Sequence, residues 1–316
     1  SMIYLLIAFS QGAAVGAGVI VAQYLGARDK KSVSDAVHTS LVIAGILGIV
    51  LTIAGIVLSR QLLEWMKTPD EVMEQAVSFF RLYSAGMFFG IVYNMAAGIL
   101  NAAGNSKRSL LYLAVASFTN IVLDILFIAI LDMGVAGAAI ATDISQAVSC
   151  ILSMAFLMRV KDSYQVSLKK LKIHRRIAGS MIRVGLPTGI QNMVISLSNV
   201  LVQTSVNGFG AAAMAGYTAY LKVDGFNILP VMSFSMAVTT FAGQNYGAGN
   251  YDRVKKGMYV TLAMGFVYTV LTGALLLTFD DQIMGMFSRD AEVITCGKLA
   301  MKYFCPFYFI LSILHG

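Results

Sequence analysis

The chain has 316 residues, of which 58% are hydrophobic and only 12% are charged. A soluble globular domain is usually about 45–50% apolar and about 25% charged, so this composition excludes a soluble domain. Apolar segments recur to the last residue, which excludes a secreted protein behind a signal peptide. The net charge of +7 is dispersed between these segments and therefore indicates no nucleic-acid partner. The sequence predicts an all-α integral membrane protein embedded in the lipid bilayer.

Nine segments are long enough to cross about 30 Å of hydrocarbon, which takes about 20 mostly apolar residues per helix. They are 2–24, 37–59, 76–103, 109–131, 134–158, 178–206, 213–245, 257–279 and 293–316. Segment 213–245 is too long for one span, so we expect its first residues, after Gly210, to form a separate short surface helix. The strict alternation over about 10 residues that is typical of transmembrane strands is absent from the sequence.

Lysine and arginine residues are concentrated in alternate gaps between the predicted spans. The gaps 25–36, 104–108, 159–177 and 246–256 contain fifteen of them, whereas the other gaps contain only Arg60, Lys67 and Arg289. Cytoplasmic loops of membrane proteins are enriched in these residues. We therefore expect a multi-pass protein of the cell membrane, with the basic gaps in the cytoplasm and the N-terminus of this chain outside.

The sequence around the first basic gap recurs around the fourth. Residues 21–33 read VAQYLGARDKKSV and residues 242–254 read AGQNYGAGNYDRV, so Gln, Gly, Ala and Val recur at a constant offset of 221. This offset spans six helices, which predicts two parallel six-helix bundles related by a pseudo-twofold axis along the membrane normal. We expect an N-terminal lobe (1–160), a cytoplasmic linker (161–177) and a C-terminal lobe (178–316). The repeat also predicts that the first helix and the last two or more helices of a twelve-span protein are missing from this chain.

Asp124 is the strongest candidate for a functional residue, because an ionisable group inside a span is costly unless it faces a cavity or a partner. Asn120 lies four residues earlier, so both side chains are expected on one face of the helix 109–131. Together they could bind a proton or provide oxygen ligands for a sodium ion. The alternative is a structural carboxylate that is hydrogen-bonded between helices. We expect no other metal site and no cofactor.

Other polar residues inside the predicted spans are weaker candidates. Asp143, with Thr142 beside it, either faces the same cavity as Asp124 or is a packed carboxylate between helices. Asn94 and Asn101 either line a pore or hold helices together through hydrogen bonds.

The span 178–206 contains polar residues that could form a wet inner wall. The candidates are Gln191, Asn192, Ser196 and Asn199. Lys222 and Asp224 lie where the next segment is expected to reach the membrane surface, and we interpret them as a surface ion pair. Gly12 and Gly16, four residues apart, predict close packing of the first helix against a neighbour.

Three local motifs make the chain resemble the multidrug and toxic compound extrusion (MATE) transporters. They are VAQYLGA (21–27) with its repeat GQNYGAG (243–249), GILNAAGNSKRS (98–109) and GLPTGIQ (185–191). The resemblance covers essentially the whole chain, as spans two to ten of a twelve-span family. It implies a monomeric antiporter that exports organic cations and drugs by alternating access, driven by an inward flow of protons or sodium ions.

The family also implies roles for particular residues. In one prokaryotic branch an Asn and an Asp one turn apart in the fifth helix act near an Asp in the first helix. Asn120 and Asp124 match that pair, because the span 109–131 becomes the fifth helix once the missing helix is counted. Another branch uses a Glu in the seventh helix, where this chain has Ile195 and Ser196. The first helix, with its expected acid, is absent from this chain, so a non-functional fragment remains an alternative.

Two other classes of function stay open at this stage. A flippase for lipid-linked sugars of related architecture would need a basic cavity, whereas these spans contain few central Lys or Arg residues. A membrane-embedded enzyme would need a nucleophile with a base, or a cluster of metal ligands, and the three histidines at 38, 174 and 315 are scattered. We therefore expect a transporter and not an enzyme.

Overall fold

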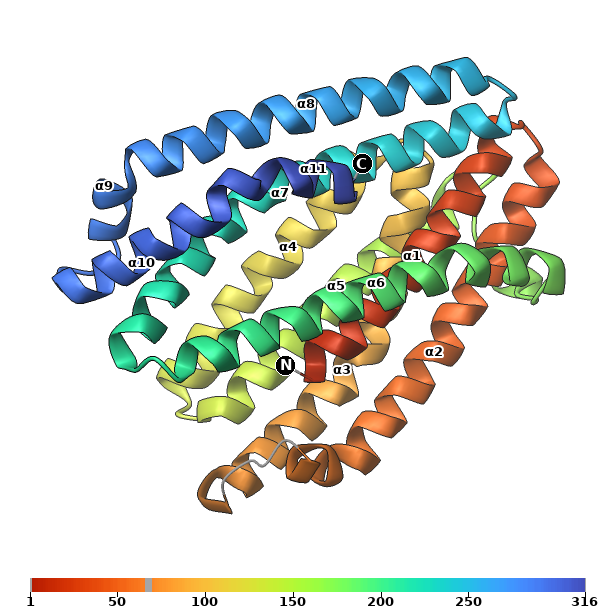
Figure 1. Ribbon diagram of the computed structural model, residues 1–316. Coiled ribbons are helices and arrows are strands. Elements are labelled where there is room, and N and C mark those ends of the chain that lie inside the picture. Colours follow the sequence, from red (N-terminus) through yellow and green to blue (C-terminus); the bar gives the residue numbers. More distant parts are fainter. Residues whose placement is uncertain (1, 66–69, 316) are drawn as a thin grey trace. The chain divides into compact units, whose positions relative to one another are not determined.

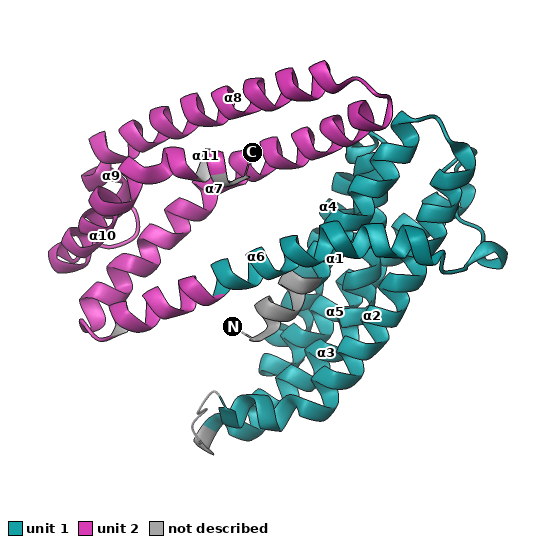
Figure 2. Ribbon diagram, turned by 45° about the vertical axis from the view of Figure 1, so that its right-hand side comes forward, with its two compact units in different colours: residues 1–196 teal, residues 197–316 magenta. Residues whose placement is uncertain are grey.

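The computed structural model describes residues 2–65 and 70–315, and all regular secondary structure in this part of the chain is helical (Figure 1). The contacts divide the chain into two compact units, residues 1–196 and 197–316 (Figure 2). The division falls inside one helix and lies later in the chain than the predicted linker, 161–177. The division of the chain into two lobes separated by that linker therefore stays a prediction.

The first unit is built around its third helix. It contains α1 (Met2–Gly26), α2 (Lys30–Trp65), α3 (Asp70–Ala102), α4 (Ser106–Asp124), a π-helical turn (Ile125–Ile130), α5 (Gly134–Arg159), a 3-10 turn (Leu168–Lys170) and the first part of α6 (Arg175–Asn207). Helix α3 contacts α1, α2, α4 and α5. Its residues Met95, Ile99 and Leu100 are almost fully buried in the core of this unit.

The second unit contains the rest of α6, α7 (Ala211–Gly247), α8 (Tyr251–Thr278), α9 (Asp280–Gly285), α10 (Ala291–Phe304), a 3-10 turn (Cys305–Phe307) and α11 (Tyr308–His315). The expected surface helix at the start of 213–245 is wrong, because α7 is continuous from Ala211 onward. The expected single span 293–316 is also interrupted. Pro306 has no N–H to donate to the helix, and the chain forms a 3-10 turn there.

Six helices among the described residues are long and apolar enough to cross a membrane. They are Lys30–Trp65, Val72–Ala102, Ser106–Ile130, Gly134–Arg159, Ala211–Gly247 and Tyr251–Thr278. Large apolar side chains on them are exposed, among them Phe118, which is 70% exposed. Helix α6 forms as predicted, but it is not among the six, because polar residues lower its hydropathy.

The same turn joins three pairs of helices, α1 to α2, α3 to α4 and α7 to α8. In each turn a backbone N–H donates to the carbonyl five residues earlier, after a residue with positive φ. The residues with positive φ are Arg28 (57°), Gly104 (74°) and Gly249 (75°). Arg28 and Gly249 occupy equivalent positions at the offset of 221, so the two copies of the predicted repeat fold alike here.

Helix α2 begins at the first of these turns because Asp29 caps it. The Asp29 carboxylate accepts hydrogen bonds from the Ser32 hydroxyl at 2.6 Å and from the Ser32 backbone N–H at 3.1 Å. These hydrogen bonds lower the pKa of Asp29 below its usual value. The cap therefore acts above the ordinary pKa of aspartate and is lost as the pH falls through the lowered value.

We expect Gly249→Ala to lower the free energy of unfolding by about 1–2 kcal/mol, because positive φ is strained for a residue with a Cβ. No atom lies within 4 Å of a Cβ added at this position, so the effect comes from the backbone alone. Thermal unfolding in detergent measures it. The matched control is Arg28→Gly, which relieves the equivalent strain and should not lower the stability. An unchanged melting temperature for Gly249→Ala would contradict this account.

A segment between α5 and α6 is held against α2 by His38. His38 is only 1% exposed, and its Nδ1 lies 2.6 Å from the Ser34 carbonyl oxygen. On the other side of the ring, Nε2 accepts a hydrogen bond from the Ser167 backbone N–H at 3.0 Å. Both contacts are satisfied only when the proton is on Nδ1, so the fold selects this neutral tautomer.

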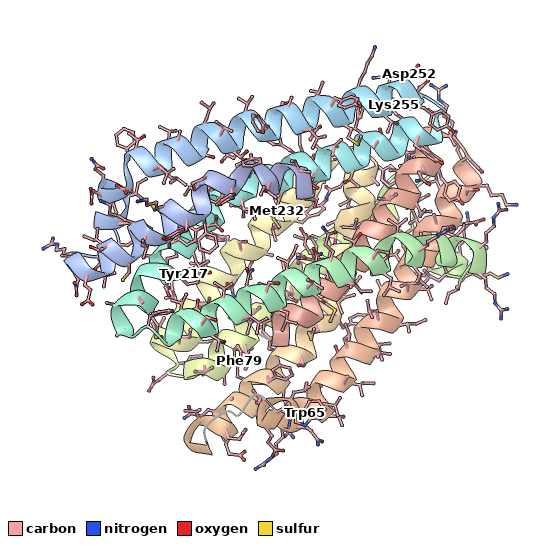
Figure 3. The ribbon with its side chains drawn as sticks, in the orientation of Figure 1. Trp65, Phe79, Tyr217, Met232, Asp252 and Lys255 are labelled. Atoms are coloured by element: carbon pink, nitrogen blue, oxygen red, sulfur yellow. The ribbon has the colours of Figure 1, made fainter. Side chains whose placement is uncertain are left out.

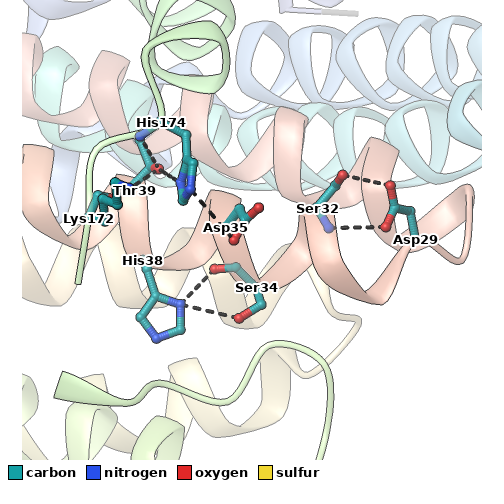
Figure 4. Close-up of polar contacts among 8 residues, drawn as sticks. All are labelled: Asp29, Ser32, Ser34, Asp35, His38, Thr39, Lys172 and His174. Atoms are coloured by element: carbon teal, nitrogen blue, oxygen red, sulfur yellow. Dashed lines mark hydrogen bonds and ion pairs between the residues drawn. The ribbon is translucent and has the colours of Figure 1, made fainter. Parts of the chain in front are cut away.

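A second attachment lies one residue further along α2 (Figure 4). The Thr39 hydroxyl oxygen accepts from the His174 backbone N–H at 3.2 Å and donates to the Lys172 carbonyl at 3.3 Å. The His174 Nε2 lies 3.9 Å from the Asp35 carboxylate. We call residues 166–174 the strap, because backbone groups in it are bound to α2.

We expect His38→Phe to destabilise the first unit by about 1–3 kcal/mol, because the partly buried Ser167 N–H would lose its acceptor. Thermal unfolding in detergent and limited proteolysis of residues 160–174 measure the loss. Ser34→Ala is the control, since it keeps the carbonyl that His38 contacts. Equal proteolysis of the His38 variant and the wild type would show that the strap is held by other contacts.

Candidate functional site

A cavity of about 320 Å³ lies inside the first unit, between α1, α3, α4 and α5. It is lined by Ser10, Gln11, Tyr83, Met87, Gly90, Ile91, Tyr93, Asn94, Leu113, Ala116, Ser117, Asn120, Thr142, Ser145, Gln146 and Ser149. Most of these side chains carry a hydroxyl or an amide. None of the described lining residues is an Asp, Glu, Lys or Arg, so the part of the wall that the structure describes is polar but uncharged.

One member of the predicted pair on α4 lines this cavity. Asn120 lines it, and Asp124 follows one helical turn later, outside the lining set. Both side chains are partly buried. The Asn120 Nδ2 and the Asp124 Oδ1 are buried atoms with no hydrogen-bond partner among the residues that the structure describes. A buried polar atom without a partner costs about 1–3 kcal/mol, so these two atoms are suited to receive a ligand.

The backbone changes its geometry directly after Asp124. Residues Ile125–Ile130 form a π-helix, in which the Leu131 N–H donates to the Leu126 carbonyl at 3.0 Å. Single π-helical turns within α-helices occur often at functional sites. The predicted span 109–131 forms as one continuous helix, Ser106–Ile130, and Asp124 lies at the junction of its α-helical and π-helical parts.

The neighbouring candidates on α5 have different surroundings. Thr142 lines the cavity, and its hydroxyl donates to the Ala138 carbonyl of its own helix at 2.9 Å. The Asp143 side chain instead lies against α3, where a Cβ added to Gly86 would collide with the carboxylate. The Asp143 carboxylate contacts the Gly86 backbone, and Asp143 is not among the described residues that line the cavity. Of the two interpretations of Asp143, the geometry favours the carboxylate packed between helices.

Only one of the two asparagines proposed on α3 faces the cavity. Asn94 lines it, whereas Asn101 lies two turns further along, near the end of α3, and does not. The four candidates on α6 are also not in the lining set: Gln191, Asn192, Ser196 and Asn199. Gln191 and Asn199 are exposed, and the other two are partly buried. The structure brings together Asn94, Asn120 and Thr142, with Asp124 beside them.

A polar stripe on α5 was only partly recognised from the sequence. Ser145, Gln146 and Ser149 line the cavity with Thr142, at spacings of three, four and seven residues. This spacing puts them on one helix face and could have identified them. The Gln146 amide reaches the α3 backbone because Gly90 has no side chain. A Cβ at Gly90 would collide with the amide oxygen.

The predicted packing through Gly12 and Gly16 is confirmed. A Cβ on Gly12 would lie 2.5 Å from the Cα of Gly189, and one on Gly16 would lie 2.8 Å from the Cα of Gly185. The start of α6 therefore approaches α1 backbone to backbone, directly on either side of Pro187. This contact fixes α1, which provides Ser10 and Gln11 to the cavity.

Comparison with known proteins identifies the family. The family model described as MatE matches residues 1–126 and 187–315. This chain belongs to the MatE family. It is 28% identical over 302 residues to the probable multidrug resistance protein YoeA of Bacillus subtilis, covering 93% of this chain and 65% of that protein. It is 26% identical over 306 residues to the probable multidrug resistance protein NorM of Thermotoga maritima, covering 95% and 66%.

A solved MATE structure has the same fold as this chain. The structure is described as the outward-facing conformation of a multidrug resistance MATE family transporter of the MOP superfamily. The TM-score is 0.91 at 26% identity, covering 99% of this chain and 70% of that one. The prediction of an all-α membrane fold of the MATE type is confirmed. The chain spans about two thirds of the length of the curated relatives it matches.

We expect the cavity to be accessible to water in the membrane. Ser117 lines it, whereas its neighbour Phe118 is 70% exposed on the outer, apolar surface of α4. In a chain whose native cysteines are replaced by Ala, Ser117→Cys should therefore react with a charged thiol reagent many times faster than Phe118→Cys. The reason is that only a hydrated thiol forms the reactive thiolate. Equal rates of labelling would show that the cavity is dry.

Proposed function

We propose that this MatE chain forms the core of an antiporter that exports organic cations and drugs in exchange for protons or sodium ions. The observation that carries the proposal is the polar, uncharged cavity of the first unit, with Asp124 as the carboxylate beside it. The names of its curated relatives as multidrug resistance proteins support this proposal.

In this proposal, Asn120 and Asp124 bind the small ion. The carboxylate would take up a proton, or would bind a sodium ion together with the Asn120 side-chain oxygen. The hydroxyl of Thr142 keeps its lone pairs free after donating to its own helix, so it can add a further oxygen. All three groups are neutral or become neutral when the small ion binds, which suits an apolar surrounding.

The organic cation would occupy the same cavity. Tyr83, Tyr93 and Met87 in the lining offer aromatic faces and an adaptable thioether, which suit varied cations with large apolar surfaces. In the proposed cycle, the cation and the small ion compete for one negative charge at Asp124. Export follows if the binding of one releases the other while the cavity opens alternately to the two sides of the membrane.

A flippase for lipid-linked sugars is the second candidate, and the charge of the cavity discriminates between the two. A site for a phosphate-linked headgroup needs Lys or Arg side chains. The residues that the structure describes around the cavity include neither. The geometry therefore favours the export of cations.

We expect Asp124→Asn to abolish drug-coupled flux of protons or sodium ions in proteoliposomes, because the amide carries no charge for the two cations to share. The flux is measured with a proton gradient and, separately, with a sodium gradient, which also identifies the coupling ion. Asp132→Asn is the matched control, since Asp132 is exposed and lies outside the cavity. Undiminished coupled flux in the Asp124 variant would refute the proposed role.

A further inference from the structure

The second unit has its own buried polar cluster, on the face of α7 that packs against α10 and α11. Tyr217 lies on α7 (Figure 3), and Tyr220 and Asp224 follow it by three and seven residues, a spacing that puts all three on one face of the helix. The hydroxyl of Tyr220 lies 3.3 Å from the hydroxyl of Tyr308 at the start of α11. Both tyrosines are only 3% exposed.

Asp224 belongs to this cluster and not to the membrane surface. Its carboxylate interacts with the hydroxyls of both Tyr220 and Tyr308. The expected surface ion pair with Lys222 is wrong, because the described residues show no ion pair between them. Lys222 lines an open pocket on another side of α7. Residues two apart on a helix point in different directions, which explains the separation.

Among the residues that the structure describes, no Lys, Arg or His side chain pairs with this carboxylate. The titratable groups that face it are Tyr217 and Tyr220 on its own helix, and Cys305 and Tyr308 on the facing segment. The rest of the cluster is apolar and includes the fully buried Met284 and Met301. An ionised carboxylate without a cation is unfavourable in such a place.

We propose that Asp224, Tyr220 and Tyr308 form a proton-binding site. The carboxyl group and the two hydroxyls can be joined by three hydrogen bonds, one between each pair of groups, and the two tyrosine hydroxyls provide only two protons. A third proton, on the Asp224 carboxyl, completes all three bonds and removes the charge of this partly buried group. The site joins α7 to α11, so binding and loss of the proton change the packing between these two helices.

A proton suits the cluster better than a metal ion. Hard cations such as Ca²⁺ and Mg²⁺ bind about six or more oxygen atoms, whereas the carboxylate and the two hydroxyls together provide four. The ring of Phe304 stacks on Tyr220 with centroids 5.4 Å apart and closes one side. This site lies in the second unit and is independent of the role proposed for Asp124.

Infrared spectroscopy of the whole protein in lipid vesicles tests the proposal, because a protonated carboxyl has a C=O band separate from those of a carboxylate. We expect a band that disappears at alkaline pH and that Asp224→Asn removes. Tyr308→Phe should keep this band but shift its frequency, since one hydrogen bond to the carboxyl is lost. This variant also keeps the test open if Asp224→Asn does not fold.

The controls separate this site from other carboxyl groups. Asp280→Asn, at a surface residue that pairs with Lys298 at 3.5 Å, should leave the band unchanged. Asp124→Asn should also leave it unchanged, so failure of the transport proposal and failure of this one are distinguishable. Identical spectra of the wild type and Asp224→Asn would overturn the proposal. A band that disappears on adding sodium at constant pH would overturn it in favour of a sodium site.

Discussion

Hydrocarbon cannot form hydrogen bonds, and this constraint determines most of the structure. Every backbone N–H and C=O inside a bilayer must find its partner within the protein, so the spans are helices. Side-chain hydroxyls obey the same constraint locally. Thr142, Ser145, Ser149 and Thr269 each donate to a carbonyl of their own helix. Among the described residues, buried side-chain atoms of Asn120, Asp124, Asp143 and Asn227 are exceptions to this constraint, since they have no hydrogen-bond partner.

The helices and the repeat could be predicted because they depend on local composition. Runs of apolar residues predict the spans, and the recurring Gln-x-x-Gly-Ala motif predicts the turns after Gly26 and Gly247, which have matching hydrogen bonds. The π-helical turn could not be predicted, because Ile125–Ile130 contains only apolar residues that fit either helix type. The continuous α7 was missed since its length exceeds one bilayer crossing and suggested a break.

The sequence predicts which types of residue form the candidate site, but not the directions in which their side chains point. Asn94, Asn120 and Thr142 reach the cavity, while Asp143, only one residue after Thr142, points toward α3. The rotation of α5 about its own axis decides this difference. Gly86 and Gly90 set that rotation, because they leave room on α3 for the side chains of Asp143 and Gln146. The sequence does not say which helices are neighbours, so contacts of this kind between helices become visible only in the structure.

The strap between α5 and α6 also defines where the chain tolerates added sequence. Tyr164 and Val166 are buried in the core of the first unit, and the backbone of residues 167, 172 and 174 is bound to α2. Lys161 and Asp162, by contrast, are exposed in the short bend that precedes these anchors. A fluorescent reporter or epitope inserted into that bend would lengthen a loop at a small cost in entropy. The same insertion a few residues later would break the hydrogen bonds that hold the strap to α2.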